Sequence, residues 1–322
     1  MEPSPPQLPE PGPGTRALAA AASAAMFLPA RLPLGALAAL GRLAGSIAYL
    51  ALPRRRKIAR VNVERAKEAG FLPEGVDAGK TARLSFGTVA QTLLEGMVLH
   101  QRGLEPFVGR WRVDGRENAR AALGLSAASG SGVVFLTAHM GPWELAPHVM
   151  RAEFGISMAV VGRAQGGGIL ERLMVEARTG TGNSFIFKDR GAREMLKILK
   201  RGGHIGTLID QAAVVEREGA ELSFMGRPAR TNLGPYKLAA RTGATVVPLF
   251  ARREGGEAVI EIHPLLAPPA PRDDPEGLWP AAAAQKVNDL LGEQVRLRPP
   301  EWMWGHRRWK TPEGIRADPG FF

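Results

Sequence analysis

The sequence predicts an α/β protein: a single domain with a central, mostly parallel mixed sheet flanked by helices, preceded by a membrane-associated helical N-terminal region. Two observations carry this prediction. Short apolar runs alternate with helical patterns from residue 132 to residue 263, and strands that are apolar along their whole length are typical of a sheet covered on both faces. Near the N-terminus, an apolar stretch runs directly into a basic cluster.

Composition limits the classes of function. The chain has 322 residues, of which 45% are hydrophobic, so a substantial core is expected rather than global disorder. The absence of cysteine excludes thiol nucleophiles, disulfides and thiolate zinc sites. A formal net charge of +11 suits anionic lipid, nucleic acid or an acidic protein, or is simply a solvated basic surface. With only 6% aromatic residues there is little support for base stacking, so we expect no nucleic-acid partner.

The N-terminal region has two predicted parts. Residues 1–15 are proline-rich and lack the positive start of a secretory signal, which predicts a disordered tail. Residues 16–57 hold two apolar stretches and end in the basic cluster 53–57. This pattern suits a membrane surface, where apolar side chains enter the interface and cations meet anionic headgroups. It leaves open whether the segment spans the bilayer, and an alanine-rich hairpin packed on a soluble domain is the alternative reading.

The remaining residues, 58–322, form the predicted catalytic domain. Its first part, 58–103, has a helical pattern, and 111–115 reads as a short strand and turn. Further strands are predicted at 132–138, 156–162, 184–187, 204–209, 245–250 and 258–263. Helices are predicted between them at 143–153, 169–178, 192–202 and 233–241, the first with a start that Pro147 can delay, and a polar loop precedes the last.

The most informative motif is His139-Met140-Gly141-Pro142-Trp143-Glu144, which directly follows the strand at 132–138. An imidazole at a strand end can take a proton from a hydroxyl near pH 7, and a carboxylate behind it can fix its tautomer. Alone, this spacing also fits a structural histidine. His148 raises a second reading, a metal site with His139 and Glu144, but the spacing is not a usual zinc signature. No G-x-S-x-G elbow supports a serine hydrolase.

Two further segments are candidates for substrate contact. Asp210 and Gln211 follow the strand at 204–209, so they belong on the same sheet edge as His139, either as a polar wall for a substrate headgroup or as a turn cap. The triple glycine at 166–168 could cradle phosphate, but a flexible turn is favoured because no lysine-serine signature follows.

The motif resembles the first motif of the bacterial lipid A late acyltransferases, the lauroyl and myristoyl transferases within the glycerol-3-phosphate acyltransferase-like superfamily. The similarity covers nearly the whole chain after the proline-rich tail. It continues, in order, through the basic segment 53–57 and residues 161–163, 188–190, 209–211, 224–231, 246–250 and 300–310. One departure is Pro142, because the family often has asparagine before the Trp-Glu pair.

The resemblance implies transfer of a fatty acyl group from acyl carrier protein to a hydroxyl of a lipid A precursor, with no cofactor beyond the acyl thioester co-substrate. In that mechanism His139 is the general base, Glu144 orients it, and Arg163 is the cation that stabilises the oxyanion. Substrate-binding roles are implied for Lys188, Arg190, Asp210 and Gln211, with Arg190 resembling a phosphate-contacting arginine. The implied setting is the cytoplasmic face of the cell inner membrane, where one basic surface meets both the acidic carrier protein and anionic lipid.

Alternatives remain at this stage. The acceptor could be a phosphatidylinositol mannoside, an ornithine lipid or a lysophospholipid, and an inert membrane-interaction protein on the same scaffold is the rival from another class. Acyl chain length, the acceptor hydroxyl and a coenzyme A donor are not decided by the sequence. Residues 301–310 contain three of the six tryptophans, which suits either a membrane interface or a C-terminal clasp.

Overall fold

The computed structural model describes residues 27–163, 169–188, 191–213 and 219–309. The predicted tail at 1–15, most of the first apolar stretch, the triple glycine at 166–168 and Arg190 lie outside these residues. The described chain confirms the predicted fold class. A seven-stranded sheet has the order β1-β9-β8-β2-β5-β3-β4, and every neighbouring pair is parallel except β8 and β9.

The sheet strands lie close to the predicted positions. Their bounds are β1 Trp111–Asp114, β2 Val133–Thr137, β3 Met158–Gly162, β4 Ser184–Phe187, β5 His204–Leu208, β8 Thr245–Glu254 and β9 Glu257–Ile262. Alternate residues of β2 enter two separate cores, with Val134 and Leu136 on one face and Val133 and Phe135 on the other. The sheet is therefore buried on both faces, which explains its nearly continuous apolar strands.

Helices cover both faces of the sheet. One face is packed by α8 Ala192–Lys200, α9 Gly234–Thr242 and α10 Trp279–Leu297, the other by α5 Arg116–Ser129, α6 Ala146–Phe154 and α7 Ile169–Thr179. Helix α6 begins later than predicted, with Pro147 in its first turn, where a missing N–H costs nothing. Helices α5 and α10 have no counterpart in the sequence prediction.

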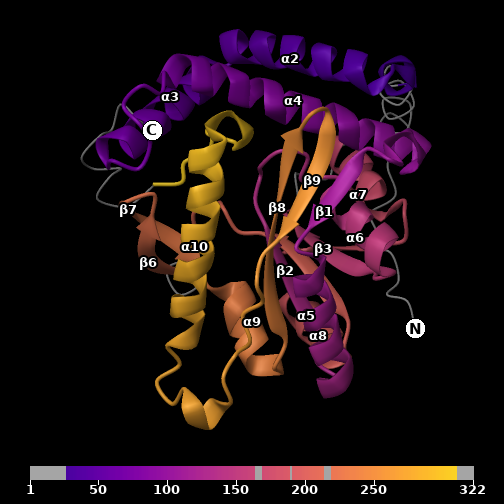
Figure 1. The fold of residues 1–322 in the computed structure, drawn as a ribbon, viewed down its shortest axis with the longest axis vertical. Helices are drawn as coiled ribbons and strands as arrows, with labels where there is room; N and C mark the ends of the chain where they lie inside the picture. The colour runs from indigo at the N-terminus through magenta and orange to yellow at the C-terminus, as the bar shows by residue number, and fades with distance from the viewer. Residues whose placement is uncertain (1–26, 164–168, 189–190, 214–218, 310–322) are drawn as a thin grey trace.

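The prediction of a polar loop before α9 is wrong for residues 219–232. Residues 219–232 contain an antiparallel hairpin, β6 Gly219–Phe224 and β7 Arg227–Asn232. Its two-residue turn places Met225 and Gly226 at φ 50° and 72°, the backbone that a tight right-twisted hairpin requires. The hairpin packs beside α10 (Figure 1).

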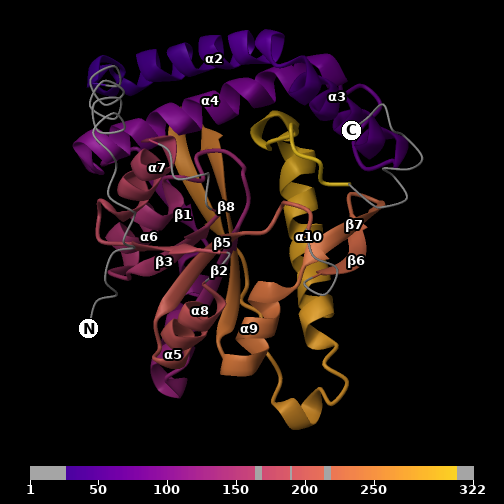
Figure 2. The same ribbon diagram turned by 180° about the vertical axis from the view of Figure 1, so that it is seen from behind.

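The N-terminal helices form a separate layer. Helix α2 Leu34–Ala51 lies along α4 Ala78–Arg102, and the two cross over one end of the sheet in both views (Figures 1 and 2). The contact is close because a Cβ on Gly45 would lie 2.4 Å from the Cα of Gly87. In the chain, α3 Pro53–Glu68 connects α2 with α4, and the basic cluster forms its first turn.

Helix α2 leaves a large apolar surface uncovered. Leu43, Ile47 and Leu50 are all more than half exposed, at 59%, 58% and 69%. Of the residues that the structure describes, α2 forms the one helix long and apolar enough to cross a membrane, with 18 residues and a mean hydropathy of 1.5. A core helix of a soluble protein would bury such a stripe, so the apolar N-terminal helix weakly indicates membrane association.

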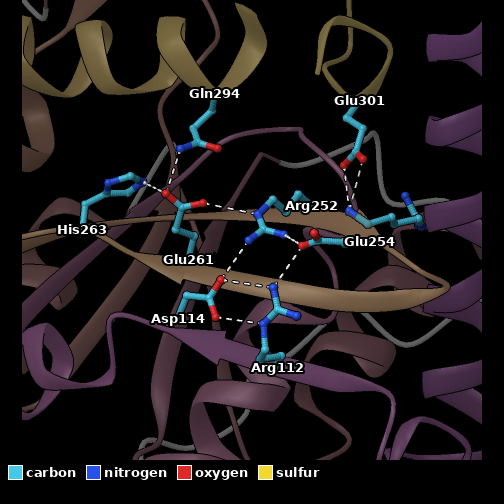
Figure 3. Close-up of polar contacts among 9 residues, drawn as sticks. Arg112, Asp114, Arg252, Glu254, Glu261, His263, Gln294 and Glu301 are labelled. Carbon is cyan, nitrogen blue, oxygen red and sulfur yellow. Dashed lines mark hydrogen bonds and ion pairs between the residues drawn. The ribbon is translucent and has the colours of Figure 1, made fainter. Parts of the chain in front are cut away.

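Strand β8 runs past its predicted end and carries Arg252 into a polar network with its neighbours (Figure 3). The guanidinium donates to Asp114 of β1 at 2.8 Å, to Glu261 of β9 at 3.3 Å and to Glu254. Gln294 of α10 donates to the other oxygen of Glu261 at 3.0 Å. Three carboxylates thereby compensate the charge of a buried arginine, and these contacts connect β1, β8, β9 and α10.

Candidate active site

The turn that carries His139 is built from β2 and the C-terminal segment. Met140 forms a β-bridge with Trp302, and the N–H of Met303 donates to the carbonyl oxygen of His139 at 3.0 Å. Gly141 has φ 54°, and a Cβ there would lie 2.4 Å from the carbonyl oxygen of Ala251. Only glycine fits this position, so the backbone after His139 is fixed tightly against β8.

His139 is paired with Asp210. The imidazole Nδ1 lies 2.8 Å from Oδ1 of Asp210, and the backbone N–H of His139 donates to Oδ2 at 3.2 Å. The sheet explains the meeting, because β2 and β5 are parallel neighbours and Thr137 lies opposite Leu208. Two residues past each strand end, the chains therefore place His139 beside Asp210 at the carboxyl edge, where α/β sheets bind their ligands.

Asp210 is buried, and its surroundings favour the charged form. Burial alone raises the pKa of a carboxyl group, but the charge and hydrogen bond of His139, together with the indole N–H of Trp302 at 3.0 Å, hold the pKa of Asp210 well below its ordinary value. An ionised Asp210 accepts a hydrogen bond from the N–H at Nδ1 of His139. The imidazole then keeps a lone pair on Nε2, the state that a general base needs.

The predicted contact between Glu144 and His139 is not observed. Glu144 instead forms a two-point ion pair with Arg178, with Nε–Oε2 and Nη2–Oε1 distances of 2.8 and 2.5 Å. Trp143 lies next to both groups: its indole donates to Glu144 at 3.1 Å, and its ring meets the His139 ring edge-on at 5.4 Å. The carboxylate that orients His139 in this structure is therefore Asp210, the residue predicted as part of a headgroup wall.

The Glu144–Arg178 pair is almost entirely buried. Burial raises the pKa of Glu144, but the charge and hydrogen bonds of Arg178 outweigh it, so the pKa of Glu144 is lowered. Arg178 is affected in the opposite sense: burial favours its neutral form, yet Glu144 raises its pKa above the ordinary value. Both groups stay charged, and Glu144 acts on His139 as a nearby negative charge rather than as a hydrogen-bond partner.

The three residues of the alternative metal site, His139, Glu144 and His148, do not face one another as a set of ligands. His139 faces Asp210 and Glu144 faces Arg178, while Nδ1 of His148 lies 2.6 Å from the hydroxyl of Thr181. Burial lowers the pKa of His148 to about 4, so this imidazole is neutral. In the parts of the chain that the structure describes, no group of three His, Asp or Glu residues could hold a metal ion.

Four adjacent strands present polar residues at the same edge. In the sheet order β2, β5, β3 and β4, the residues after each strand include His139, Asp210, Arg163 and Lys188. Arg163 is exposed, Lys188 is half-buried, and Gln211, which follows Asp210, is also half-buried. The sequence predicted this shared edge for His139, Asp210 and Gln211, and the structure adds Arg163 and Lys188 to it. Their contacts with a substrate stay predictions.

The C-terminal tryptophans form a clasp over this edge. Trp302 and Trp304 are fully buried and Trp309 is 5% exposed, which favours the clasp reading over a membrane interface. Trp302 is the functional residue that the sequence did not reveal, since its indole contacts Asp210 from 92 residues away. His306 lies in the same segment, and burial lowers its pKa to about 4 although Asp210 acts to raise it.

Two apolar cavities meet at Glu144. One, of about 40 Å³, lies between the sheet and α6 and is lined mainly by aliphatic and aromatic side chains such as Phe135, Met150 and Val160. The other, of about 110 Å³, lies between α4 and α7 and is lined by residues that include Leu93, Met97 and Leu173. Both linings are mainly apolar and suit hydrocarbon, and both cavities include Glu144, which is five residues from His139 in the chain.

Comparison with known proteins identifies the family of this chain. A model of the bacterial lipid A biosynthesis acyltransferases matches residues 14–311. The chain is 25% identical to the lipid A biosynthesis lauroyltransferase of Escherichia coli K12 over 304 residues, 90% of each protein. It is 26% identical to the phosphatidylinositol mannoside acyltransferase of Mycobacterium tuberculosis H37Rv over 200 residues, 61% of this chain and 59% of that protein.

A similar match, 24% over 188 residues, joins the chain to the phosphatidylinositol mannoside acyltransferase of Mycolicibacterium smegmatis and covers 58% of that protein. The alignments with the mycobacterial relatives thus span less than two thirds of their length. The family model, in contrast, extends over nearly all of the present sequence. The chain belongs to the bacterial lipid A biosynthesis acyltransferase family.

Proposed function

We propose that this protein transfers a fatty acyl group from an acyl thioester, carried by acyl carrier protein, to a hydroxyl of a lipid A precursor. The observation that carries the proposal is the His139–Asp210 pair at the carboxyl edge of the sheet, with Nδ1 and Oδ1 2.8 Å apart. Family membership supports acyl transfer, and the lauroyltransferase match over 90% of both chains supports the acceptor.

The proposed reaction is a direct displacement on the thioester. Nε2 of His139 takes the proton of the acceptor hydroxyl as its oxygen attacks the thioester carbonyl carbon. The tetrahedral intermediate then expels the carrier's thiolate, and the imidazolium returns its proton to that sulfur. Asp210, ionised and hydrogen-bonded to Nδ1, stabilises the imidazolium that exists between the two steps. The products are an ester and a free thiol, and no acyl-enzyme or cofactor is needed.

Arg163 is the proposed stabiliser of the oxyanion. It follows β3, two strands from β2 in the sheet, and its side chain is exposed at the edge that carries His139. Arg163 lies close enough to this edge for its charge to contribute to lowering the pKa of His306. Asp210 acts to raise the same pKa and His139 acts to lower it. A fixed cation at this edge would favour the negative oxygen of the intermediate over the neutral carbonyl.

The remaining expected roles fit around this pair. Lys188, Gln211 and Arg190 are proposed to bind the polar part of the acceptor, and the two apolar cavities at Glu144 to receive the start of the acyl chain. The exposed apolar face of α2 and the basic start of α3 support attachment to the cytoplasmic face of the inner membrane. A net charge of +11 supports the acidic carrier protein as donor.

A phosphatidylinositol mannoside is the second candidate acceptor. The mycobacterial relatives that transfer acyl groups to this glycolipid are matched at 26% and 24% identity, comparable with the lauroyltransferase. Both acceptors offer a hydroxyl on a phosphorylated glycolipid, so the same base serves either one. The mycobacterial matches cover a smaller share of the chain, which favours the lipid A precursor.

The test is direct acyl transfer by the purified full-length protein. Acyl carrier protein with a labelled acyl chain is supplied with a lipid A precursor, a phosphatidylinositol mannoside or neither, and products are resolved by mass spectrometry. We expect an acylated lipid A precursor, and its loss in His139→Ala. Deletion in the host should remove one secondary acyl chain from lipid A. Normal transfer by His139→Ala would reject the mechanism, and unchanged lipid A would favour the second acceptor.

A further inference from the structure

A third cavity is lined by Pro142 and Leu145 of the turn that follows His139, here called the catalytic turn, and not by His139 itself. It measures about 390 Å³ and is lined by residues of α2, α4, the segment before β1, the catalytic turn and the β8–β9 turn. Unlike the two cavities at Glu144, it has a mixed lining that includes three arginines, Arg42, Arg110 and Arg253. Three arginines from three separate elements thus converge on one cavity.

The arginines retain unused donors. Nη1 of Arg253 is buried and has no hydrogen-bond partner, although Nη2 of the same group donates to Glu95 at 2.6 Å and to Thr92 at 2.8 Å. Arg42 and Arg110 are exposed, and among the described residues neither side chain forms an ion pair or hydrogen bond. A buried guanidinium N–H without an acceptor is unfavourable unless a ligand or water supplies one.

Among the described residues, none of the carboxylates in the lining is paired with Arg42 or Arg110. Glu95 is already paired with Arg253, and Glu254 accepts from Arg112 at 3.0 Å and from Arg252 (Figure 3). Glu257 is the one remaining carboxylate among the described lining residues, and it is exposed. The lining thus contains three arginines and three glutamates, but the side chains of Arg42 and Arg110 and Nη1 of Arg253 have no acceptor among the described residues. Planar guanidinium groups match the oxygens of phosphate.

The position of the cavity identifies the kind of phosphate. Arg42 immediately precedes Leu43, which is 59% exposed on the apolar face of α2. Leu34, Gly35 and Ala38 of the same helix also line the cavity. We propose that this cavity binds the phosphate of an anionic phospholipid headgroup, held by Arg42, Arg110 and Arg253. The choice of a lipid source rests on the proposed membrane contact of α2, whereas the phosphate chemistry rests on the arginines alone.

This binding site is connected to the catalytic turn. Thr92 accepts from Arg253 and donates its own hydroxyl to the carbonyl oxygen of Gly141 at 2.8 Å. By a second route, the backbone N–H of Arg253 donates to the Glu301 carboxylate at 2.9 Å, and the carbonyl oxygen of Glu301 accepts from the N–H of Gly141 at 3.0 Å. A phosphate on Arg253 therefore binds the side chain that helps hold the turn carrying His139.

The binding test uses the full-length protein in neutral detergent and two soluble probes, glycerophosphoglycerol and inorganic phosphate, by titration calorimetry. The double variant Arg42→Gln/Arg110→Gln should bind glycerophosphoglycerol about a hundredfold more weakly, as expected for losing two charge-assisted contacts. The matched control Arg60→Gln/Arg120→Gln removes the same charge from exposed sites on α3 and α5 and should bind like the parent. Thermal unfolding of both variants checks that they are folded.

A vesicle flotation experiment identifies the source of the phosphate. Vesicles of phosphatidylcholine with phosphatidylglycerol should retain the parent and control proteins better than the cavity variant, and pure phosphatidylcholine should not distinguish them. Binding of inorganic phosphate with no vesicle preference would overturn the lipid source. Equal probe binding by both double variants, or no binding by the parent, would overturn the site itself. His139→Ala should bind both probes normally, so failure of the proposed reaction is distinguishable from failure of this site.

Discussion

His139 and Asp210 lie 71 residues apart in the chain, yet Nδ1 of the imidazole is 2.8 Å from the carboxylate. The contact exists because β2 and β5 are parallel neighbours whose carboxyl ends are level. Trp302 of the C-terminal segment completes it from the other side of Asp210. The base, its orienting carboxylate and the donor behind that carboxylate thus come from three distant segments.

The first prediction concerns Asp210. In Asp210→Asn the amide presents a donor where the carboxylate accepted, which disfavours the tautomer with a free Nε2, so kcat for acyl transfer should fall about a thousandfold. Steady-state kinetics with labelled acyl carrier protein measure it. The variant Glu144→Gln is the comparison, because it alters the carboxylate that the sequence pattern suggested. If Glu144→Gln and Asp210→Asn changed the pH–rate profile in the same way, the assignment of Asp210 would be wrong.

The second prediction is that the indole of Trp302 helps to keep the pKa of Asp210 low. Trp302→Phe keeps the ring packing but removes the indole N–H that donates to Oδ2 at 3.0 Å, so kcat should fall about tenfold, the value of one charge-assisted hydrogen bond. The acid limb of the pH–rate profile should also move to higher pH. With one donor fewer, the Asp210 carboxylate is more basic and stabilises the protonated form of His139 more strongly.

The control for this change is Trp309→Phe. Trp309 is equally buried, but its indole donates to the carbonyl oxygen of Phe224 at 3.2 Å, away from Asp210. It should lose stability like Trp302→Phe while keeping the parental pH profile. Identical profiles in the two variants would reduce Trp302 to a packing residue.

Glu144 and Arg178 are predicted to matter for stability as a pair. Glu144→Gln leaves a buried guanidinium without its counter-ion, which should lower the free energy of unfolding by about 3 kcal/mol. The double variant Glu144→Gln/Arg178→Met removes both charges and should recover most of that loss. Urea unfolding measures both, with Glu293→Gln, from an exposed pair with Arg296, as a control expected to change little. No recovery in the double variant would contradict the pairing.

His148 gives a prediction for pH dependence. Its folded-state pKa, about 4, lies below the ordinary value of 6.5, so between these values the unfolded chain binds a proton that the folded chain rejects. Stability should therefore fall as pH drops from about 6.5 to about 4, with roughly 2 kcal/mol lost by pH 5 from this group alone. Urea unfolding at pH 7 and pH 5 measures the loss.

The matched variant is His148→Asn, which keeps a polar group near Thr181 but does not titrate. It should be less stable than the parent at pH 7, and the difference should narrow by about 2 kcal/mol at pH 5. A constant difference across this range would show that His148 does not enter the acid response.

The alternation of apolar runs and helical patterns was sufficient to predict the sheet, its mostly parallel order and its burial on both faces. Strand ends were also predicted well, which placed His139, Asp210 and Gln211 on one edge. The hairpin at β6 and β7 was missed because its strands are half-exposed and carry mixed side chains. Helix α10 was missed too, although it forms much of the core on one face.

The sequence by itself determined that His139 follows a buried strand, and its ordered motifs indicated the family. It could not decide which carboxylate serves the histidine, because Glu144 is close in the chain whereas Asp210 is close only in the sheet. Strand order, which no local pattern encodes, placed β5 beside β2 and so brought Asp210 to Nδ1. The tertiary fold also supplied Arg178 for Glu144 and Trp302 for Asp210, since each buried charge needs partners that only distant segments provide.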